Sequence, residues 1–296
     1  MNYRITISNS KNKYISSKHP IILNNELITI EGDCANLEWE NQDGSVCLLL
    51  GDLLGERDKN KIDTSSKNYK NLADFKKISE FEGRFVMVKI STNNCISVWT
   101  DYFGRANVYW VSEKEICYIT SGKEMIPHDA DLGSVDQNGL AQVLSIYGSR
   151  PLKKHTLRKK LNRLGINEKL AINGNKLSID KTPFNPKVVF KKDDYSKLHD
   201  YSNLFIEAVR ARASEIQNIV LLSSGWDSTS ILATLCHLFS SDKIECVIGR
   251  MRYSKRSKII NQFELDRAQK FADYYNVKLH VIDLDYTKDA NKIRDE

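Results

Sequence analysis

The feature that most constrains the fold is a change of hydrophobic period near residue 185. Before it, short apolar or alternating segments are separated by Gly, Asn and Asp, which is typical of strands. After it, strand-like and helix-like segments alternate, and this order predicts a parallel sheet built from βαβ units. A chain of 296 residues is long enough for two domains. We therefore predict one domain over residues 1–185 and a second over 186–296, joined near the two prolines of Thr182-Pro183-Phe184-Asn185-Pro186.

The first domain is expected to be α+β and dominated by antiparallel sheet. Its helices are predicted at 71–81, where Leu72, Phe75, Ile78 and Phe81 are apolar, and at 137–147. A hairpin is predicted at 168–179, because Asn173-Gly174-Asn175 suits a tight turn. The other strands are expected at residues 4–8, 45–50, 83–90, 96–100, 108–111 and 116–120.

The second domain is expected to be α/β. Asp194 is a plausible N-cap for a helix whose apolar spacing continues to Ile216. Strands are then predicted at 218–222, 244–248 and 277–284, and helices at 228–239 and 264–275.

Composition excludes several classes of protein. Hydrophobic residues make up 41% of the chain, and no run reaches the roughly 18 to 20 apolar residues of a membrane span. Residues 1–7 alternate like a strand and do not resemble a secretory signal, so we expect a cytoplasmic protein without a membrane partner. The six cysteines form no CxxC pair and the six histidines are scattered, which leaves zinc, iron–sulfur and disulfide-scaffold interpretations without support.

Two basic segments have alternative interpretations. Residues 150–163 contain seven basic residues and no acidic one, which suits either an RNA-binding patch or a solvated connecting segment. We favour the connecting segment because aromatic residues do not interleave with the charges, and the net charge of +6 is mild. Nucleic acid is therefore not an expected partner. The basic run from Arg250 to Lys258 follows the second strand and offers either a phosphate contact or a loop.

The strongest chemical signal is the segment from Leu221 to Thr229, between an apolar strand and an apolar-faced helix. Small residues at 223–225 allow an anion to approach the backbone, and Ser228 and Thr229 open the helix. Asp227 would repel a bare phosphate unless it holds a bridging divalent cation. The segment lacks the spacing of a Walker A or dinucleotide motif. Its alternative interpretation is a serine-rich helix cap with an acidic first turn.

Two further residues have simpler expectations. We expect Trp226 to be a packing residue, with a base-stacking platform as the less favoured alternative. Glu264 is interpreted as an acid at a helix start, favoured by the helix dipole, with a substrate-side carboxylate as the alternative.

The loop sequence Ser223-Ser224-Gly225-Trp226-Asp227-Ser228 resembles the SGGxDS loop of PP-loop ATP pyrophosphatases, with Ser224 in place of the first glycine. Weaker likenesses along most of the chain point to the asparagine synthetase family. These are Gly83-Arg84-Phe85-Val86, Asp101-Tyr102-Phe103-Gly104, Thr120-Ser121-Gly122-Lys123, Tyr147-Gly148, His155-Thr156-Leu157, Leu164-Gly165, Val247-Ile248-Gly249 and Glu264-Leu265-Asp266-Arg267-Ala268. The resemblance implies an Ntn-hydrolase-like amidotransferase domain followed by a PP-loop domain of the adenine nucleotide α-hydrolase type.

The resemblance also implies an activity and a site. The chain would be an ATP-dependent carbon–nitrogen ligase that forms AMP and pyrophosphate: a carboxylate is activated as an acyl-adenylate, and ammonia or an amine then attacks it. Asp227 would take Mg²⁺. The loop would hold the pyrophosphate, and the backbone of Leu222 and Ile248 would contact adenosine. The implied nucleotide-binding residues are Leu222, Ser223, Ser224, Gly225, Asp227, Ser228 and Ile248.

The sequence departs from the family at both ends. Glutamine-hydrolysing members carry a cysteine after the initiator Met, where this chain has Asn2, and Leu50-Gly51-Asp52 replaces the family's Asn-Gly-Glu turn. We therefore expect no glutaminase activity and a scaffold role for the first domain, as in β-lactam synthetases and lasso-peptide cyclases. Family members also extend further and carry a second acidic Mg-binding motif, which is absent after Leu284. We expect a truncated PP-loop domain whose strand 218–222 has an open edge for a second copy or a partner chain.

Three functions remain open from the sequence. The first is the amide synthetase, which works with ammonia or an amine. The second is a catalytically incomplete fragment or subunit that binds nucleotide or a partner. The third, least favoured, is a PP-loop enzyme that modifies tRNA.

Overall fold

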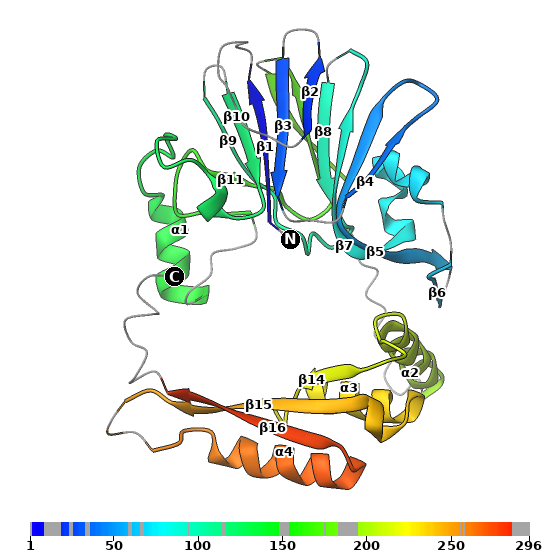
Figure 1. Ribbon diagram of the computed structural model, residues 1–296. Coiled ribbons are helices and arrows are strands. Elements are labelled where there is room, and N and C mark those ends of the chain that lie inside the picture. Colours follow the sequence, from blue (N-terminus) through cyan, green and yellow to red (C-terminus); the bar gives the residue numbers. More distant parts are fainter. Residues whose placement is uncertain are drawn as a thin grey trace. The chain divides into compact units, whose positions relative to one another are not determined.

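The protein is represented by a computed structural model of all 296 residues. The chain divides into two compact units, Met1–Lys191 and Lys192–Glu296, and each is described by itself (Figure 1). The expected junction at the two prolines and the N-cap Asp194 lie outside the described residues. The described residues are 2–8, 19–23, 26–32, 36–58, 61–65, 68–93, 95–113, 116–147, 154–174, 176–182, 195–254, 256 and 258–285.

Within its described residues, unit 1 contains two antiparallel sheets, in agreement with the predicted α+β class (Figure 1). The first has the order β11-β9-β10-β1-β3-β2, and the second β13-β12-β8-β7-β5-β4, with β6 paired to β5. The first sheet is formed by β1 (Tyr3–Ser8), β2 (His19–Leu23), β3 (Glu26–Gly32), β9 (Tyr109–Ser112), β10 (Ile116–Thr120) and β11 (Asn162–Arg163). The second is formed by β4 (Asn36–Glu40), β5 (Val46–Asp58), β6 (Lys61–Asp63), β7 (Phe81–Ile90), β8 (Cys95–Thr100), β12 (Glu168–Asn173) and β13 (Lys176–Lys181).

The core of unit 1 lies between the two sheets. Ile5 of β1 and Val88 of β7 belong to the same buried cluster, and both side chains are fully buried. On the other face of β7, Phe85 and Met87 pack with Trp99 in a second cluster. Strand β7 is therefore apolar on both faces, which is why residues 83–90 read as a nearly continuous hydrophobic run.

The helix predicted at 71–81 is wrong in type. The segment forms two 3₁₀ helices, η1 (Tyr69–Ala73) and η2 (Phe75–Glu80), which meet at Asp74. The extended backbone of Asp74 interrupts the helix, and its carboxylate accepts a hydrogen bond from the Lys76 N–H at 3.0 Å. Such local side-chain bonds compete with helix continuation.

Two further sequence expectations need correction. The helix predicted at 137–147 is α1 (Gln137–Gln142) followed by a π-helical segment, η4 (Val143–Tyr147). Strands β2, β3, β4, β6 and β11 were not predicted. The strand expected at 45–50 continues to Asp58, past a register shift between Leu53 and Gly55.

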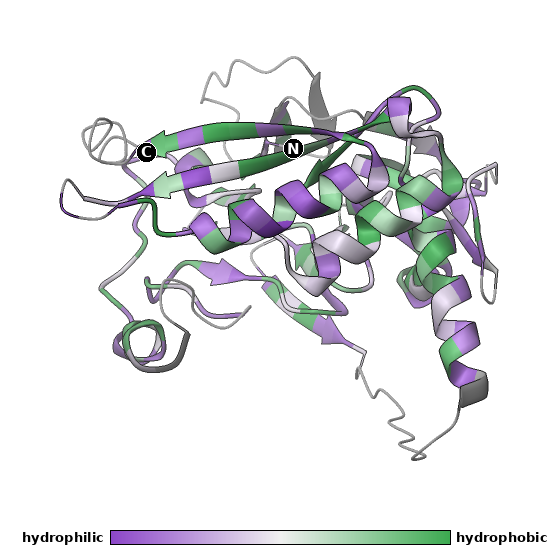
Figure 2. Cartoon of the chain, turned by 90° about the horizontal axis from the view of Figure 1, so that it is seen from below, coloured by the Kyte–Doolittle hydropathy of each residue, from purple (hydrophilic) through white to green (hydrophobic). Residues whose placement is uncertain are grey.

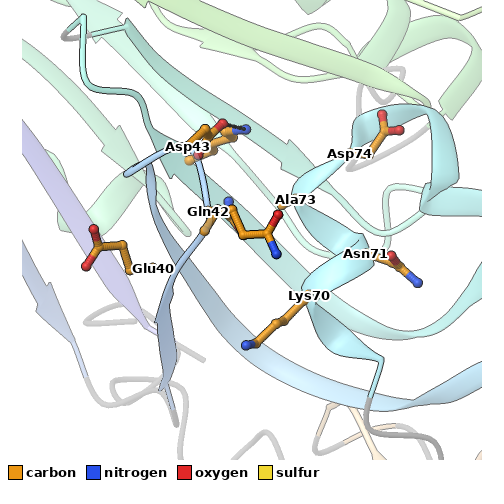
Figure 3. A pocket seen from close by; sticks show the side chains of 9 residues that line it. Glu40, Gln42, Asp43, Lys70, Asn71, Ala73 and Asp74 are labelled. Atoms are coloured by element: carbon orange, nitrogen blue, oxygen red, sulfur yellow. Dashed lines mark hydrogen bonds and ion pairs between the residues drawn. The ribbon is translucent and has the colours of Figure 1, made fainter.

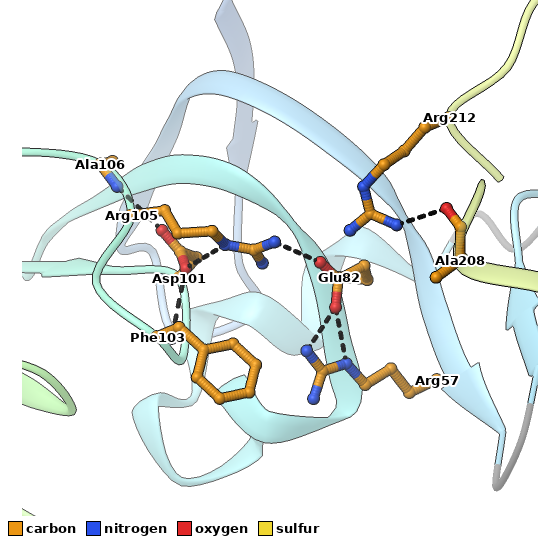
Figure 4. A network of polar contacts seen from close by, with 8 residues as sticks. All are labelled: Arg57, Glu82, Asp101, Phe103, Arg105, Ala106, Ala208 and Arg212. Atoms are coloured by element: carbon orange, nitrogen blue, oxygen red, sulfur yellow. Dashed lines mark hydrogen bonds and ion pairs between the residues drawn. The ribbon is translucent and has the colours of Figure 1, made fainter. Parts of the chain in front are cut away.

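A buried carboxylate joins three parts of the second sheet (Figure 4). Glu82 of β7 is 5% exposed. It accepts a hydrogen bond from Arg57 Nε of β5 at 2.9 Å, and its other oxygen lies 2.6 Å from Arg105 Nη1, in the turn after β8. Asp101 holds that turn by accepting from Arg105 Nε at 3.1 Å and from the Ala106 N–H at 3.0 Å. Burial alone would raise the pKa of Glu82, but the two arginines outweigh it and lower the pKa from its ordinary 4.5.

The described part of unit 2 contains the predicted parallel sheet, with the order β14-β15-β16. Its strands are β14 (Asn218–Leu221), β15 (Ile244–Arg252) and β16 (Lys278–Asp285), and its helices are α2 (Tyr195–Arg210), α3 (Trp226–Leu238), η5 (Ser241–Lys243) and α4 (Gln262–Tyr275). Leu232 and Leu235 of α3 share a buried cluster with Leu265 and Ala268 of α4 and with Cys246 of β15. These two helices therefore cover one face of the sheet. In Figure 2 the helix ribbons alternate between hydrophilic and hydrophobic residues, as expected of helices with one buried face.

The first helix of unit 2 is shorter than predicted. It ends at Arg210, whereas apolar spacing suggested a helix to Ile216. The amide of Asn218 donates to the Ser214 carbonyl at 2.8 Å and its oxygen accepts from the Ser214 N–H at 2.9 Å, which closes a turn before β14. None of the helices formed by the described residues has both the length and the apolar composition needed to cross a membrane.

Replacing Phe85 tests the core of unit 1. Because Phe85 is 0% exposed, Phe85→Ala should lower the free energy of unfolding by about 3–5 kcal/mol. Urea titration followed by the fluorescence of the buried Trp39 and Trp99 measures this. Leu37→Ala, at a position 46% exposed, is the control and should change stability by less than about 0.5 kcal/mol. Equal effects of the two variants would contradict the assigned core.

The Glu82 network predicts a pH-dependent contribution to stability. A carboxyl whose folded-state pKa is lowered contributes stability above its unfolded pKa and loses it as the pH falls through the folded value. Glu82→Gln should cost about 1–3 kcal/mol at pH 7, and the gap to wild type should narrow as the pH falls below about 5. Urea unfolding of both proteins from pH 7 to pH 3, with Glu38→Gln on the exposed side of β4 as control, measures the gap. A gap that is constant with pH would contradict the ion pairs.

Candidate functional site

The candidate site is the connection between β14 and α3. Leu222, 1% exposed, follows β14, and its N–H donates to the Val247 carbonyl of β15 at 2.8 Å. Ile248, the next residue of β15, is 5% exposed. Because β14 and β15 are parallel, this connection lies at the carboxyl edge of the sheet. Open parallel sheets bind ligands at that edge.

Two serines close the connection into a loop. The Ser228 hydroxyl lies 3.1 Å from the Ser223 backbone nitrogen, from which it accepts, and 3.1 Å from the Ser223 hydroxyl. Between them, Ser224 is 6% exposed and has a φ of 59°. This left-handed conformation favours glycine, which gives a physical reason for the glycine that the resembling motif has at this position.

The loop ends at a helix start without a side-chain cap. Gly225 is the N-cap of α3, and no side chain among the described residues bonds to the first-turn N–H groups. A Cβ added to Gly225 would meet only the Ser223 hydroxyl, at an ordinary 3.4 Å. The φ of −80° is also open to other residues. Neither the backbone conformation nor the packing requires glycine at position 225. Because glycine has no side chain, the N–H groups at the helix start remain accessible to an anion.

Two further groups lie in the first residues of α3. Thr229 Oγ1 is buried without a hydrogen-bond partner among the described residues, and such an atom is costly unless a ligand or water satisfies it. Asp227 is exposed in the first turn of α3. The described residues contain no group of three or more potential metal ligands. One carboxylate suits Mg²⁺, which commonly takes its other ligands from phosphates and water.

The structure brings the expected loop residues together and changes the interpretation of neighbouring ones. Trp226 is not a packing residue within the described part of the chain, because it is 91% exposed. As the first residue of α3, its side chain leans toward the helix N-terminus and away from the core. Arg250 and Arg252 lie within β15, which extends further than predicted. Glu264 is in the first turn of α4, as expected of an acid at a helix start.

Four described members of the basic tract 150–163 bind to other parts of unit 1. Lys154 Nζ lies 2.8 Å from Glu168, and Lys160 pairs with Asp131. Arg158 donates to the Gly133 carbonyl at 3.2 Å, and Arg163 donates to Asn107 Oδ1 at 2.6 Å. These four cations therefore have partners within unit 1.

Unit 1 also has a depression of about 540 Å³ that the sequence did not indicate (Figure 3). It is lined by Glu40, Asn41, Gln42, Asp43, Lys70, Asn71, Ala73, Asp74 and Lys89. Hydrogen bonds from Ser45, more than the charge of Lys89, hold the pKa of Asp43 at about 2. Asn41 is committed to Ser45, Cys47 and Trp39. With these groups engaged internally, we assign no chemistry to the depression.

The other residues considered for chemistry are placed as follows. Burial raises the pKa of Cys117 to about 12 and that of Cys246 to about 11. Neither is therefore a thiolate near neutral pH. Residues 50–52, the counterpart of a substrate-binding turn in the resembling family, lie within β5, and Asn2 is exposed.

Comparisons with known proteins show a distant structural likeness. No family model and no curated protein matches the chain. Among solved structures, a glutamine phosphoribosylpyrophosphate (PRPP) amidotransferase from B. subtilis, complexed with ADP and GMP, is similar over 87% of this chain and 76% of its own. The identity is 9% and the TM-score 0.34. A likeness this remote supports no inference about the site.

The left-handed conformation of Ser224 predicts a stability change. Ser224→Gly should raise the free energy of unfolding by up to about 1 kcal/mol, because glycine adopts this conformation without steric cost. Ser224→Val should lower it by at least as much, since β-branched residues are disfavoured at positive φ. Urea titration of wild type and both variants measures whether the free energy of unfolding falls in the order glycine, serine, valine. Greater stability of the valine variant would contradict the loop geometry.

Proposed function

We propose that the loop from Leu222 to Ser228 binds the pyrophosphate portion of Mg-ATP, and that the chain belongs to an ATP-dependent carbon–nitrogen ligase. The observation that carries the proposal is the loop itself. A left-handed residue, a glycine that the fold does not require, and an uncapped helix start coincide at the carboxyl edge of a parallel sheet. This combination suits an extended anion better than it suits a simple helix cap.

Each loop residue has a proposed role. The N–H groups at the start of α3 and the hydroxyls of Ser223 and Ser228 would donate to pyrophosphate oxygens. Asp227 would hold Mg²⁺, which would neutralise charge on the departing pyrophosphate. The backbone of Leu222 and Ile248 would face the adenosine, because Leu222 pairs with Val247 beside Ile248.

The proposed reaction is the one that the resemblance to the asparagine synthetase family implies. A carboxylate oxygen of the substrate attacks the α-phosphorus of ATP, and the bond to pyrophosphate breaks. The nitrogen of ammonia or an amine then attacks the acyl carbon, which releases AMP and leaves an amide. Preorganised N–H donors stabilise the charge that develops on the leaving pyrophosphate.

We also propose that unit 1 does not hydrolyse glutamine. Asn2 carries a carboxamide where glutaminase relatives carry a nucleophilic thiol. The amine would then come from free ammonia or from a substrate. Unit 1 would serve as a scaffold.

A second candidate function is a nucleotide-binding or partner subunit without turnover. It is favoured by β14, which pairs only with β15 within the described residues and leaves its other edge for a second copy or a partner chain. Pyrophosphate release from Mg-ATP with candidate carboxylates separates the two functions. The ligase predicts carboxylate-dependent release, and the subunit predicts binding alone.

Replacing Asp227 tests the nucleotide site. Asp227→Asn removes the charge that would hold Mg²⁺, so binding of Mg-pyrophosphate and Mg-ATP should weaken at least about tenfold, or about 1.4 kcal/mol. Titration calorimetry with each ligand, with and without MgCl₂, measures the effect. Circular dichroism should show an unchanged fold.

Glu264→Gln is the matched control, because Glu264 occupies the first turn of the neighbouring helix α4. It should bind Mg-pyrophosphate as wild type does. Unchanged affinity in Asp227→Asn would mean that the loop is only a helix cap.

A further inference from the structure

Three of the most exposed aromatic side chains of the described residues lie on unit 2, close to its strand ends. Trp226 is 91% exposed, Phe263 is 70% exposed and Tyr253 is 58% exposed. Exposure of a large aromatic ring costs free energy in proportion to the apolar area that stays in contact with water. Exposed rings of this kind are typical of binding surfaces.

The topology places these rings along one edge of the sheet. Trp226 opens α3 after β14, and Tyr253 directly follows β15, which is parallel to β14. Asn261 ties the start of α4 to β15: it accepts from the Met251 N–H at 3.0 Å and donates to the Gly249 carbonyl at 2.7 Å. Phe263 therefore lies beside the carboxyl end of β15. We call Trp226, Tyr253 and Phe263 the aromatic rim.

Cations accompany the aromatic rim. Arg252, Arg256 and Lys258 are exposed, and residues 250–263 contain five basic residues and no acidic one. A further cation, Arg267 of α4, lies over the Phe263 ring at 5.5 Å. Acids lie beside this segment too: Asp227 and Glu264 in the first turns of α3 and α4, and Asp283 and Asp285 of β16, which pair in register with Arg250 and Arg252. The segment 250–263 itself carries only basic charges beside its aromatic residues.

We propose that the aromatic rim and its three exposed cations bind a single-stranded nucleic acid. Bases stack on exposed rings without regard to sequence, while arginine and lysine follow the phosphates. The tract 150–163 has cations without interleaved aromatics, and four of its described cations bind within unit 1. The rim has both components and presents them to solvent.

The arrangement of the rings, and not the charge, decides between a nucleic acid and an acidic peptide. Both would meet the cations, but a peptide gains most from apolar side chains that fill pockets at the centre of an interface. The rim instead presents separate rings, carried by two helix starts and one strand end. Successive bases have π faces that match such separated rings.

Fluorescence anisotropy of the full chain with a labelled 12-nucleotide oligouridylate, without ATP, tests the inference. Trp226→Ala, Tyr253→Ala and Phe263→Ala should each weaken binding roughly fivefold or more, as expected for one lost stacking contact. Tyr274→Ala is the matched control, because Tyr274 is 80% exposed at the other end of α4. It should leave the affinity unchanged.

The cations are tested by salt dependence. The triple variant Arg252→Ala, Arg256→Ala, Lys258→Ala should lower the slope of log affinity against log salt by about 2, since each single-strand phosphate contact contributes roughly 0.7. A control triple variant, Lys76→Ala, Lys77→Ala, Lys123→Ala in unit 1, should keep the wild-type slope. An oligodeoxyuridylate tests whether the ribose hydroxyl matters.

Two outcomes would overturn the inference. One is absence of oligonucleotide binding at 50 mM salt in wild type. The other is binding of a polyglutamate peptide as tightly as the oligonucleotide, with equal sensitivity to loss of the rings. Because Asp227 is retained and ATP is omitted throughout, failure of the nucleotide site would not affect either readout.

Discussion

The parallel pairing of β14 with β15 is the constraint on which the candidate site depends. The hydrogen bond from the Leu222 N–H to the Val247 carbonyl extends that pairing one residue past β14. It fixes the point at which the chain leaves the sheet, and therefore where Ser223–Ser228 turns into α3. This register places the left-handed Ser224 and the uncapped helix start at the carboxyl edge of the sheet. The hydroxyl of Ser228 then holds the loop against Ser223.

The same sheet is incomplete on its second face within the described residues. Ile219 and Leu221 of β14 are 66% and 76% exposed, and Ile282 of β16 is 52% exposed. Val220 and Cys246, which pair with each other in register on the opposite face, are buried in the cluster formed with α3 and α4. Parallel sheets are normally covered on both faces. An assembly that covers β14 would therefore also stabilise the base of the candidate loop.

The sequence correctly predicted those elements whose hydrophobic periodicity fits only one type of secondary structure. Tyr3, Ile5 and Ile7 alternate, and β1 forms with all three buried. The apolar residues of 71–81 recur every third position, a spacing that fits a 3₁₀ helix, with 3.0 residues per turn, as well as one face of an α-helix. The extended backbone of Asp74 separates two 3₁₀ helices and excludes one continuous α-helix over 71–81. Its conformation depends on a local hydrogen bond.

Only part of the candidate site could be predicted from the sequence. Contiguous residues such as Ser223 and Gly225 could be named because one loop contains them all. The exposure of Trp226 could not be predicted, since an aromatic residue at the start of a helix packs inward or outward depending on its tertiary neighbours. The aromatic rim was missed for the same reason: Trp226 and Phe263 are 37 residues apart in sequence and meet at one edge only through the βαβ connection.

A crystal structure of the chain with Mg²⁺ and pyrophosphate tests the central claim most directly. The account predicts pyrophosphate at the N–H groups that open α3, with Mg²⁺ between it and Asp227. Pyrophosphate bound elsewhere, or a loop without ligand at saturating concentration, would contradict it.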